Sequence, residues 1–198
     1  MPLGTVEEGT SVNLDAAKAI TNGFMADDEL KWLASAAMKH RRIVEIGSWT
    51  GRSTRALTDN TPGVVYAVDT WEGCPNGDLK DILAEKGEEW AFEEFQRNMQ
   101  GVKNLRVFQM TSAAASVTLR PFDPFDMIFI DGSHDYKSVR TDLVCWLPLL
   151  AVNGLICGHD YTLTRPHCAG VKQAVDEVIG PVKTMFPADG EHSIWWKE

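Results

Sequence analysis

The sequence predicts an α/β fold built on a doubly wound, mostly parallel sheet that ends in an antiparallel hairpin. Three observations predict it. Short apolar runs rich in β-branched residues alternate with segments whose apolar residues recur at helical spacing. The first run, 43–46, leads through a glycine turn into a helix start, which is the strand–loop–helix unit of such sheets. The last two runs, 182–186 and 193–196, flank a Pro-Ala-Asp-Gly turn typical of a hairpin.

The chain is expected to form one domain, residues 1–198, in three stretches. Residues 1–12 are rich in Gly, Thr, Glu and Ser and are expected to be loosely ordered. Residues 13–40 are expected to be helical, because apolar residues recur at helical spacing behind the acidic start at Asp27. Residues 41–198 are expected to form a Rossmann-like core.

Within that core, local patterns predict each element. The predicted strands are 43–46, 64–68, 105–108, 127–130, 155–157, 182–186 and 193–196. The segment 72–80 is predicted to be a loop because Gly and Pro interrupt it. The predicted helices are 82–100, a short helix from Ser112, 136–150 and 171–178. Asp135 is the expected cap of the third helix, and Pro148 with Asn153-Gly154 its expected end.

Composition argues against several partners. The net charge of −9 and the pI near 5.0 disfavour nucleic acid and anionic membranes, because no basic face is evident. No apolar run reaches the length of a membrane span, and the N-terminus lacks a signal pattern. The four cysteines have no C-x-x-C spacing, so we expect reduced thiols and a cytoplasmic protein. Seven tryptophans are many for this length, and a homo-oligomer stays open.

The glycine loop after the first strand has three competing interpretations. The dinucleotide pattern G-x-G-x-x-G fails, because Trp49 stands between Gly47 and Gly51. The phosphate-binding P-loop fails, because the spacing is one residue short and Arg52 replaces lysine. The third interpretation is an S-adenosylmethionine loop, with Glu45 two residues before the first glycine. A junction that binds no ligand is the alternative to all three.

In the third interpretation, each ligand group has a predicted partner. The Glu45 carboxylate would meet the ligand's ammonium, while Ser53, Thr54 and nearby backbone N–H groups would meet its carboxylate. Asp69, at the end of the second strand, would grip a ribose diol. The remaining cofactor residues are predicted because they lie in the same loops or at the ends of strands: Gly47, Ser48, Trp49, Gly51, Thr70, Trp71, Ser112 and Asp131. Ser112 is predicted with equal weight to bond adenine or to cap a helix.

Two further strand ends carry candidate catalytic and metal-binding groups. His134, three residues after Asp131, is a candidate general base for a substrate hydroxyl, with Asp131 orienting it. Asp160 ends the next strand, and Asp131 with Asp160 would suit a hard divalent cation such as magnesium. His134 and His159 would instead favour a softer transition metal. The alternatives without function are a histidine that caps a loop and an acid bonded to loop amides.

These stretches resemble the class I S-adenosylmethionine-dependent methyltransferases, in particular the small-molecule group of macrocin O-methyltransferase-like and cephalosporin hydroxylase-like proteins. The resemblance runs from about residue 24 to the end, and it is carried by 44–54, 130–136 and 158–161. It implies the class I methyltransferase fold. It also implies that Gly47, Trp49 and Ser53 bind the methionine part of the cofactor and Asp69 its ribose.

The resemblance extends in part to catechol-type O-methyltransferases. In those enzymes a metal is held at the positions of Asp131 and Asp160 and by an asparagine at the position of Tyr161. Their catalytic lysine stands at the position of His134. The departure at Tyr161 puts a catechol-like metal site in doubt, and the histidine strengthens the case for a base at position 134.

The sequence therefore predicts methyl transfer from S-adenosylmethionine to a hydroxyl of a small-molecule acceptor. Two alternatives stay open. One is a module that binds S-adenosylmethionine without catalysis. The other is an oxidoreductase on the same fold, using nicotinamide or a metal and oxygen.

Overall fold

The computed structural model describes residues 11–74, 79–161, 169–186 and 193–198, and its centre is a seven-stranded sheet in the order β3-β2-β1-β4-β5-β7-β6. The first five strands in this order are parallel, and β7 runs antiparallel to both β5 and β6. This confirms the predicted fold class, including the C-terminal hairpin. The strands are β1 (Arg42–Ile46), β2 (Val64–Asp69), β3 (Leu105–Gln109), β4 (Phe125–Ile130), β5 (Leu150–Gly158), β6 (Lys183–Met185) and β7 (Ile194–Lys197).

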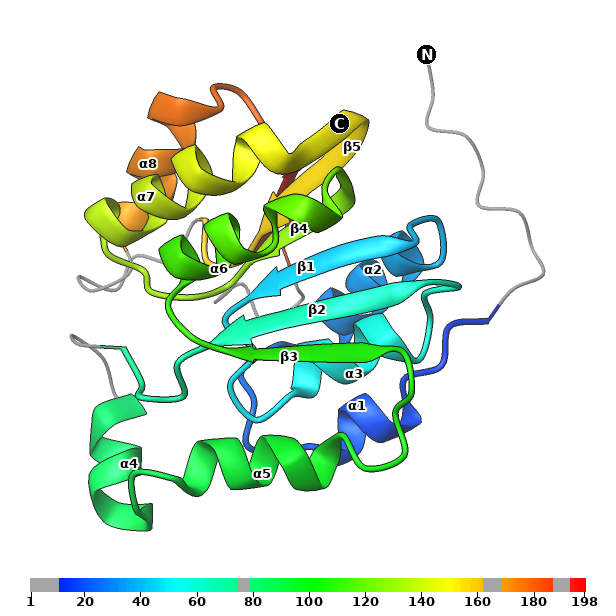
Figure 1. Cartoon of the computed structure of the whole chain (residues 1–198), viewed down its shortest axis with the longest axis vertical. Coiled ribbons are helices and arrows are strands. Elements are labelled where there is room, and N and C mark those ends of the chain that lie inside the picture. Colours follow the sequence, from blue (N-terminus) through cyan, green and yellow to red (C-terminus); the bar gives the residue numbers. More distant parts are fainter. Residues whose placement is uncertain (1–10, 75–78, 162–168, 187–192) are drawn as a thin grey trace.

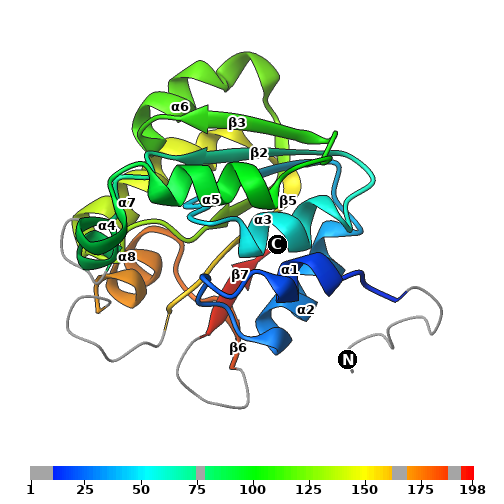
Figure 2. The same ribbon diagram turned by 90° about the horizontal axis from the view of Figure 1, so that it is seen from below.

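Helices cover both faces of the sheet (Figure 1). Helices α6, α7 and α8 pack on one face, and α1, α2 and α3 on the other, where α5 joins them against β2 and β3 (Figure 2). The α-helices are α1 (Asp15–Ala19), α2 (Asp27–Ala37), α3 (Arg52–Thr58), α4 (Leu79–Lys86), α5 (Trp90–Asn98), α6 (Ser112–Thr118), α7 (Tyr136–Trp146) and α8 (Gly170–Val178). Short 3-10 helices are η1 (Arg120–Phe122) and η2 (Leu147–Leu149). None of the helices in the described part of the chain is long and apolar enough to cross a membrane.

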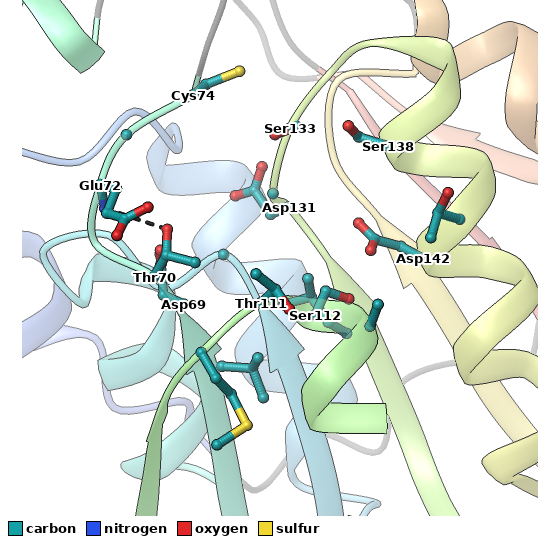
Figure 3. A pocket seen from close by; sticks show the side chains of 18 of the residues that line it. Asp69, Thr70, Glu72, Cys74, Thr111, Ser112, Asp131, Ser133, Ser138 and Asp142 are labelled. Atoms are coloured by element: carbon teal, nitrogen blue, oxygen red, sulfur yellow. Dashed lines mark hydrogen bonds between the residues drawn. The ribbon is translucent and has the colours of Figure 1, made fainter. Parts of the chain in front are cut away.

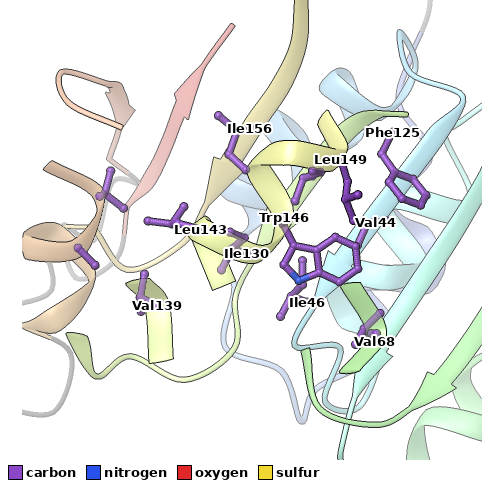
Figure 4. Close-up of a cluster of buried hydrophobic side chains, with 14 of the residues drawn as sticks. Val44, Ile46, Val68, Phe125, Ile130, Val139, Leu143, Trp146, Leu149 and Ile156 are labelled. Atoms are coloured by element: carbon purple, nitrogen blue, oxygen red, sulfur yellow. The ribbon is translucent and has the colours of Figure 1, made fainter. Parts of the chain in front are cut away.

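Strand alternation divides the core into two layers. In β1, Val44 and Ile46 face the α7 side, while Ile43 faces the α2 side. Trp146, at the end of α7, is fully buried and fills the centre of the first layer (Figure 4). Burying an aromatic of this size stabilises a fold by several kcal/mol, about 3–5 by the usual cost of truncation. The same alternation decides which side chains of each strand can reach a ligand.

Two predicted helices differ from the structure. The segment 82–100 is two helices, because Gly87 takes a left-handed φ of 105° and breaks it between α4 and α5. The helix from 136 ends at Trp146, and Asn153-Gly154 lies inside β5 rather than at the helix end. Pro148 does follow closely, within η2, and Asp135 caps α7 by accepting from the Ser138 N–H at 3.1 Å. Residues 1–12 were expected to be loosely ordered, and most of them, 1–10, lie outside the described residues. The predicted hairpin turn at 187–190 also lies outside them.

Candidate active site

A cavity of about 480 Å³ opens at the carboxyl ends of β1, β2, β3 and β4 (Figure 3). Ligands bind at this edge of open parallel sheets, and the volume suits a ligand of nucleoside size. The predicted residues that line it are Gly47, Trp49, Asp69, Thr70, Ser112 and Asp131. Predicted residues that lie behind this lining are Glu45, Ser48, Gly51, Ser53, Thr54 and Trp71.

Gly47 holds the loop after β1 against the end of β4. Its φ is 88°, and its N–H donates to Val68 O at 2.9 Å. A Cβ at this position would lie 2.0 Å from the carbonyl oxygen of Asp131, well inside van der Waals contact. Only glycine therefore fits here, on grounds of both conformation and space.

Asp69 fastens that loop from the neighbouring strand. Its Oδ2 accepts from the backbone N–H groups of Ser48 and Trp49, both at 2.8 Å, and its Oδ1 accepts from that of Trp71 at 2.8 Å. Burial raises the pKa of Asp69, and these amide donors oppose the rise. The backbone N–H groups of Ser48 and Trp49 are thus already bonded within the protein.

Glu45 lies on the far side of β1 from the cavity. Because side chains alternate along a strand, Ile46 lines the cavity while Glu45 points toward α3. Its Oε2 accepts from Ser48 Oγ at 2.7 Å and Thr54 Oγ1 at 2.5 Å, and Ser53 adds a third hydroxyl. Burial raises the pKa of Glu45 to about 7. Its Oε1 is buried and has no hydrogen-bond partner among the described residues.

Trp71 and Gly51 support the loop from the α5 side. Trp71 is buried, packs against Phe92 and Phe95, and donates its indole N–H to Trp49 O at 2.7 Å. Gly51 is the N-cap of α3 with a φ of 92°, and a Cβ there would lie 2.5 Å from the side chain of Met99. Both were predicted to contact a cofactor, but neither lines the cavity.

Ser112 is not the cap of α6. Thr111 is, because its hydroxyl accepts from the Ala114 N–H at 3.3 Å. Ser112 instead lines the cavity, where its Oγ accepts from Trp146 Nε1 at 2.8 Å and bonds the carboxylate of Asp142.

The sequence analysis missed the residues that α7 contributes to the cavity. Lys137, Ser138, Thr141 and Asp142 all line it. They form two pairs spaced four residues apart, beside the apolar face of the same helix, and this polar stripe was the available signal. Asp142 is buried, and burial raises its pKa to about 6.

A cluster of carboxylates and imidazoles adjoins the cavity at Asp131. His134 Nε2 lies 2.9 Å from Asp160 Oδ2, and one ligand atom each from Asp131, His134 and Asp160 lie within 4.8 Å of one another. Asp160 is a buried non-glycine residue with a φ of 60°, a conformation that costs energy and is often found at functional sites. The structure thus brings both predicted metal ligands and the predicted base together.

A buried histidine, His159, lies beneath this cluster and contacts three carboxylates. His159 Nδ1 lies 3.2 Å from Asp160 Oδ2 and 3.5 Å from Asp131 Oδ1, while its Nε2 lies 3.0 Å from Glu29 Oε1 on α2. Burial disfavours the imidazolium, but Asp131 and Asp160 outweigh that effect and hold the pKa of His159 well above its usual value. Burial raises the pKa of Asp131, and His159 opposes that rise. Glu29 is locally the N3 residue of α2, where its Oε2 accepts from the Ala26 N–H at 2.9 Å, and its pairing with His159 has no local sequence signal because the two are 130 residues apart.

Tyr161 points away from the cluster. Its hydroxyl donates to Asp176 Oδ1 at 2.5 Å on α8, and Lys172 lies 5.0 Å from the centre of its ring. The position that holds an asparagine in catechol-type enzymes is therefore occupied here by a residue tied to α8. His134 supplies the third group of the cluster instead.

Comparison with known proteins agrees with this architecture. Residues 44–161 match the family model described as a methyltransferase domain. A protein from Sinorhizobium fredii, the uncharacterised protein y4gI, is 30% identical over 176 residues; the match covers 84% of this chain and 18% of that protein. The chain thus spans less than a fifth of the length of that relative.

Solved structures share the fold. A Klebsiella pneumoniae protein, provisionally described as an O-methyltransferase, superposes with a TM-score of 0.67 at 18% identity, covering 92% of this chain and 86% of that one. The O-methyltransferase from Bacillus cereus, solved in complex with SAH, superposes with a TM-score of 0.59 at 19% identity, covering 91% and 85%.

Proposed function

This chain belongs to the methyltransferase-domain family, and from that premise we propose that it transfers a methyl group from S-adenosylmethionine to a hydroxyl of a small molecule. The observation that carries the proposal is the placement of the His134–Asp160 pair, at 2.9 Å, beside a cavity at the carboxyl ends of the parallel strands. The net charge of −9 supports a small molecule rather than a nucleic acid as acceptor.

The cavity's charges fit a cationic cofactor. Carboxylates of Asp69, Glu72, Asp131 and Asp142 line it, against the one ammonium group of Lys137 among the described lining residues. Such a lining favours a ligand that carries an ammonium and a sulfonium and disfavours the pyrophosphate of a dinucleotide. Glu45, the predicted partner of that ammonium, lies on the far side of β1 from this cavity, so we propose that a lining carboxylate makes the contact instead.

His134 is the proposed general base. S-adenosylmethionine, when bound, supplies the methyl group as an electrophile. Asp160 holds Nε2 of His134, so that the acceptor's proton would go to Nδ1. Asp131 lines the cavity and would orient the acceptor or a cation, and the surrounding side chains would exclude water.

The cluster also fits a divalent cation. Asp131, Asp160 and His134 would hold it, with His134 then acting as a ligand in place of its role as base, and the cation would supply a Lewis acid for the acceptor oxygen. The imidazole donor makes a transition metal that accepts nitrogen ligands, such as Zn²⁺ or Mn²⁺, a better match than Mg²⁺, which prefers oxygen ligands alone. The same cluster of histidine and carboxylates is the observation that supports metal–oxygen chemistry as the second candidate function.

Calorimetric titration tests the cofactor. The protein is titrated with S-adenosylmethionine, S-adenosylhomocysteine and NAD, without metal and then with Mg²⁺ or Mn²⁺. We expect micromolar binding of the two sulfur ligands and none of NAD. Binding of NAD alone would contradict the proposal and favour the nicotinamide alternative.

Substitution of His134 tests the base. Release of S-adenosylhomocysteine is followed across a panel of hydroxylated small molecules. His134→Ala should lower turnover by about 10²–10⁴-fold and leave cofactor affinity unchanged. His40→Ala is the matched control, because His40 precedes β1 at the opposite end of the sheet. Turnover that survives His134→Ala would exclude His134 as the base, and a complete absence of turnover with tight cofactor binding would favour the non-catalytic module.

A further inference from the structure

Helix α7 places one buried carboxylate against the cavity, that of Asp142 (Figure 3). It lies on the opposite side of the cavity from Asp69 and Glu72, and next to Ser112 at the start of α6. An ionisable group with so little exposure requires compensating partners. Its position at the junction of two helices, rather than at a strand end, sets it apart from the other acids of the site.

A hydrogen-bond relay fixes the direction of this carboxylate. Trp146 donates its indole N–H to Ser112 Oγ at 2.8 Å. Because an indole nitrogen can only donate, the Ser112 hydroxyl accepts that bond and turns its own proton toward Asp142. The relay leaves Asp142 with acceptor capacity toward the cavity, and it makes Ser112 unsuited to donate to a ligand there.

Apolar side chains also line the cavity. Ile46, Val68, Met110 and Ala113 line it, and they come from the ends of β1, β2 and β3 and the start of α6. These surfaces suit the faces of a flat heteroaromatic ring. Asp69 and Asp142 lie on opposite sides of the cavity, so a ring with its sugar toward Asp69 would direct its far edge toward Asp142.

We propose that Asp142 accepts a hydrogen bond from the exocyclic amino group of the adenine ring, and that this contact makes the site select adenosyl over inosyl ligands. The inference rests on the proposed function, because it requires an adenosine-containing ligand. A carboxylate accepts from the 6-amino group of adenine, whereas the 6-oxo group of hypoxanthine brings a second acceptor against it. Sites built to pair one polar group reject the analogue that leaves that group unpaired.

The test compares S-adenosylhomocysteine with S-inosylhomocysteine by calorimetry at pH 8, above the pKa of about 6 for Asp142. We expect the wild type to prefer the adenosyl ligand by about 10- to 100-fold, the usual worth of a hydrogen bond to a charged group. Asp142→Asn should bind the inosyl ligand about tenfold more tightly than the wild type, because a side-chain amide can donate to the 6-oxo group. Asp142→Ala should weaken binding of the adenosyl ligand.

A gain of inosyl affinity is a result that a merely structural role for Asp142 would not produce. Asp123→Asn is the matched control, since it makes the same change at an exposed position outside the cavity. Ser112→Ala should also reduce the preference for the adenosyl over the inosyl ligand, because it removes the hydroxyl that bonds Asp142. This variant tests the inference if the Asp142 variants fail to fold.

The possible failures are distinguishable. Equal binding of both ligands by the wild type, or an unchanged preference in the Asp142 and Ser112 variants, overturns this inference and leaves the proposed function standing. Binding of neither ligand to the wild type overturns both.

Discussion

Replacing Glu45 with glutamine should remove a pH dependence of stability that the wild-type protein carries. The Glu45 carboxyl is fully buried, and burial raises its pKa from 4.5 to about 7. The folded protein therefore holds this proton more tightly than the unfolded chain does. The contribution of the protonated Glu45 carboxyl to folding stability is complete below pH 4.5 and is lost as the pH rises through 7. At 1.36 kcal/mol per pH unit, the loss is about 2–3 kcal/mol between pH 5 and pH 8.

Urea unfolding of wild type and Glu45→Gln at several pH values measures this effect. Glutamine cannot ionise, and its carbonyl can accept from Ser48 and Thr54 in place of the carboxyl oxygen. The free energy of unfolding of Glu45→Gln minus that of the wild type should increase by about 2–3 kcal/mol from pH 5 to pH 8, because only the wild type loses stability over this range. Glu85→Gln, an exposed position on α4, is the control and should show no such trend. A constant difference between Glu45→Gln and wild type across this range would refute the reasoning.

Three further predictions follow from the site. Gly47→Ala should destabilise the protein by at least about 3 kcal/mol in thermal unfolding, because it adds a clash to the strain of a positive φ. Gly180→Ala, at a φ of 80° with open space around it, should cost only about 1 kcal/mol. Equal losses of stability in the two variants would contradict this reasoning. Glu29→Gln should cost about 3–5 kcal/mol in urea unfolding, because it leaves a buried imidazolium with less compensation, while the exposed Asp28→Asn should be near neutral. Mn²⁺ or Zn²⁺ at 100 times its Kd should stabilise the wild type by about 2.7 kcal/mol and should not stabilise Asp160→Asn; equal stabilisation of both would place the metal elsewhere.

The sequence predicted the sheet because each strand carries its own signal. Apolar β-branched runs, a glycine turn and a hairpin turn are local features, and strands β1 to β5 and the hairpin appear where these features fall. The helix at 82–100 was wrong because one residue, Gly87, breaks an otherwise continuous pattern. Local patterns fix which elements exist more reliably than where they end.

The site was predictable only as far as strand ends define it. Asp69, Asp131 and Asp160 follow strands, and the parallel topology brings them to one edge. The position of Glu45 behind the loop follows from strand alternation, because Ile46 next to it lines the cavity. Glu29 and Asp142 reach the site because α2 and α7 pack against the sheet. The polar stripe that contains Asp142 is visible in the sequence, but the surface that it faces is not.

The fastening of the glycine loop by Asp69 has a consequence for binding kinetics. Three backbone amides of the loops after β1 and β2 are held by one carboxylate without any ligand. The conformational entropy of ordering these loops is lost during folding, so an arriving ligand does not lose it again. We therefore expect these two loops to need no slow rearrangement when a ligand binds.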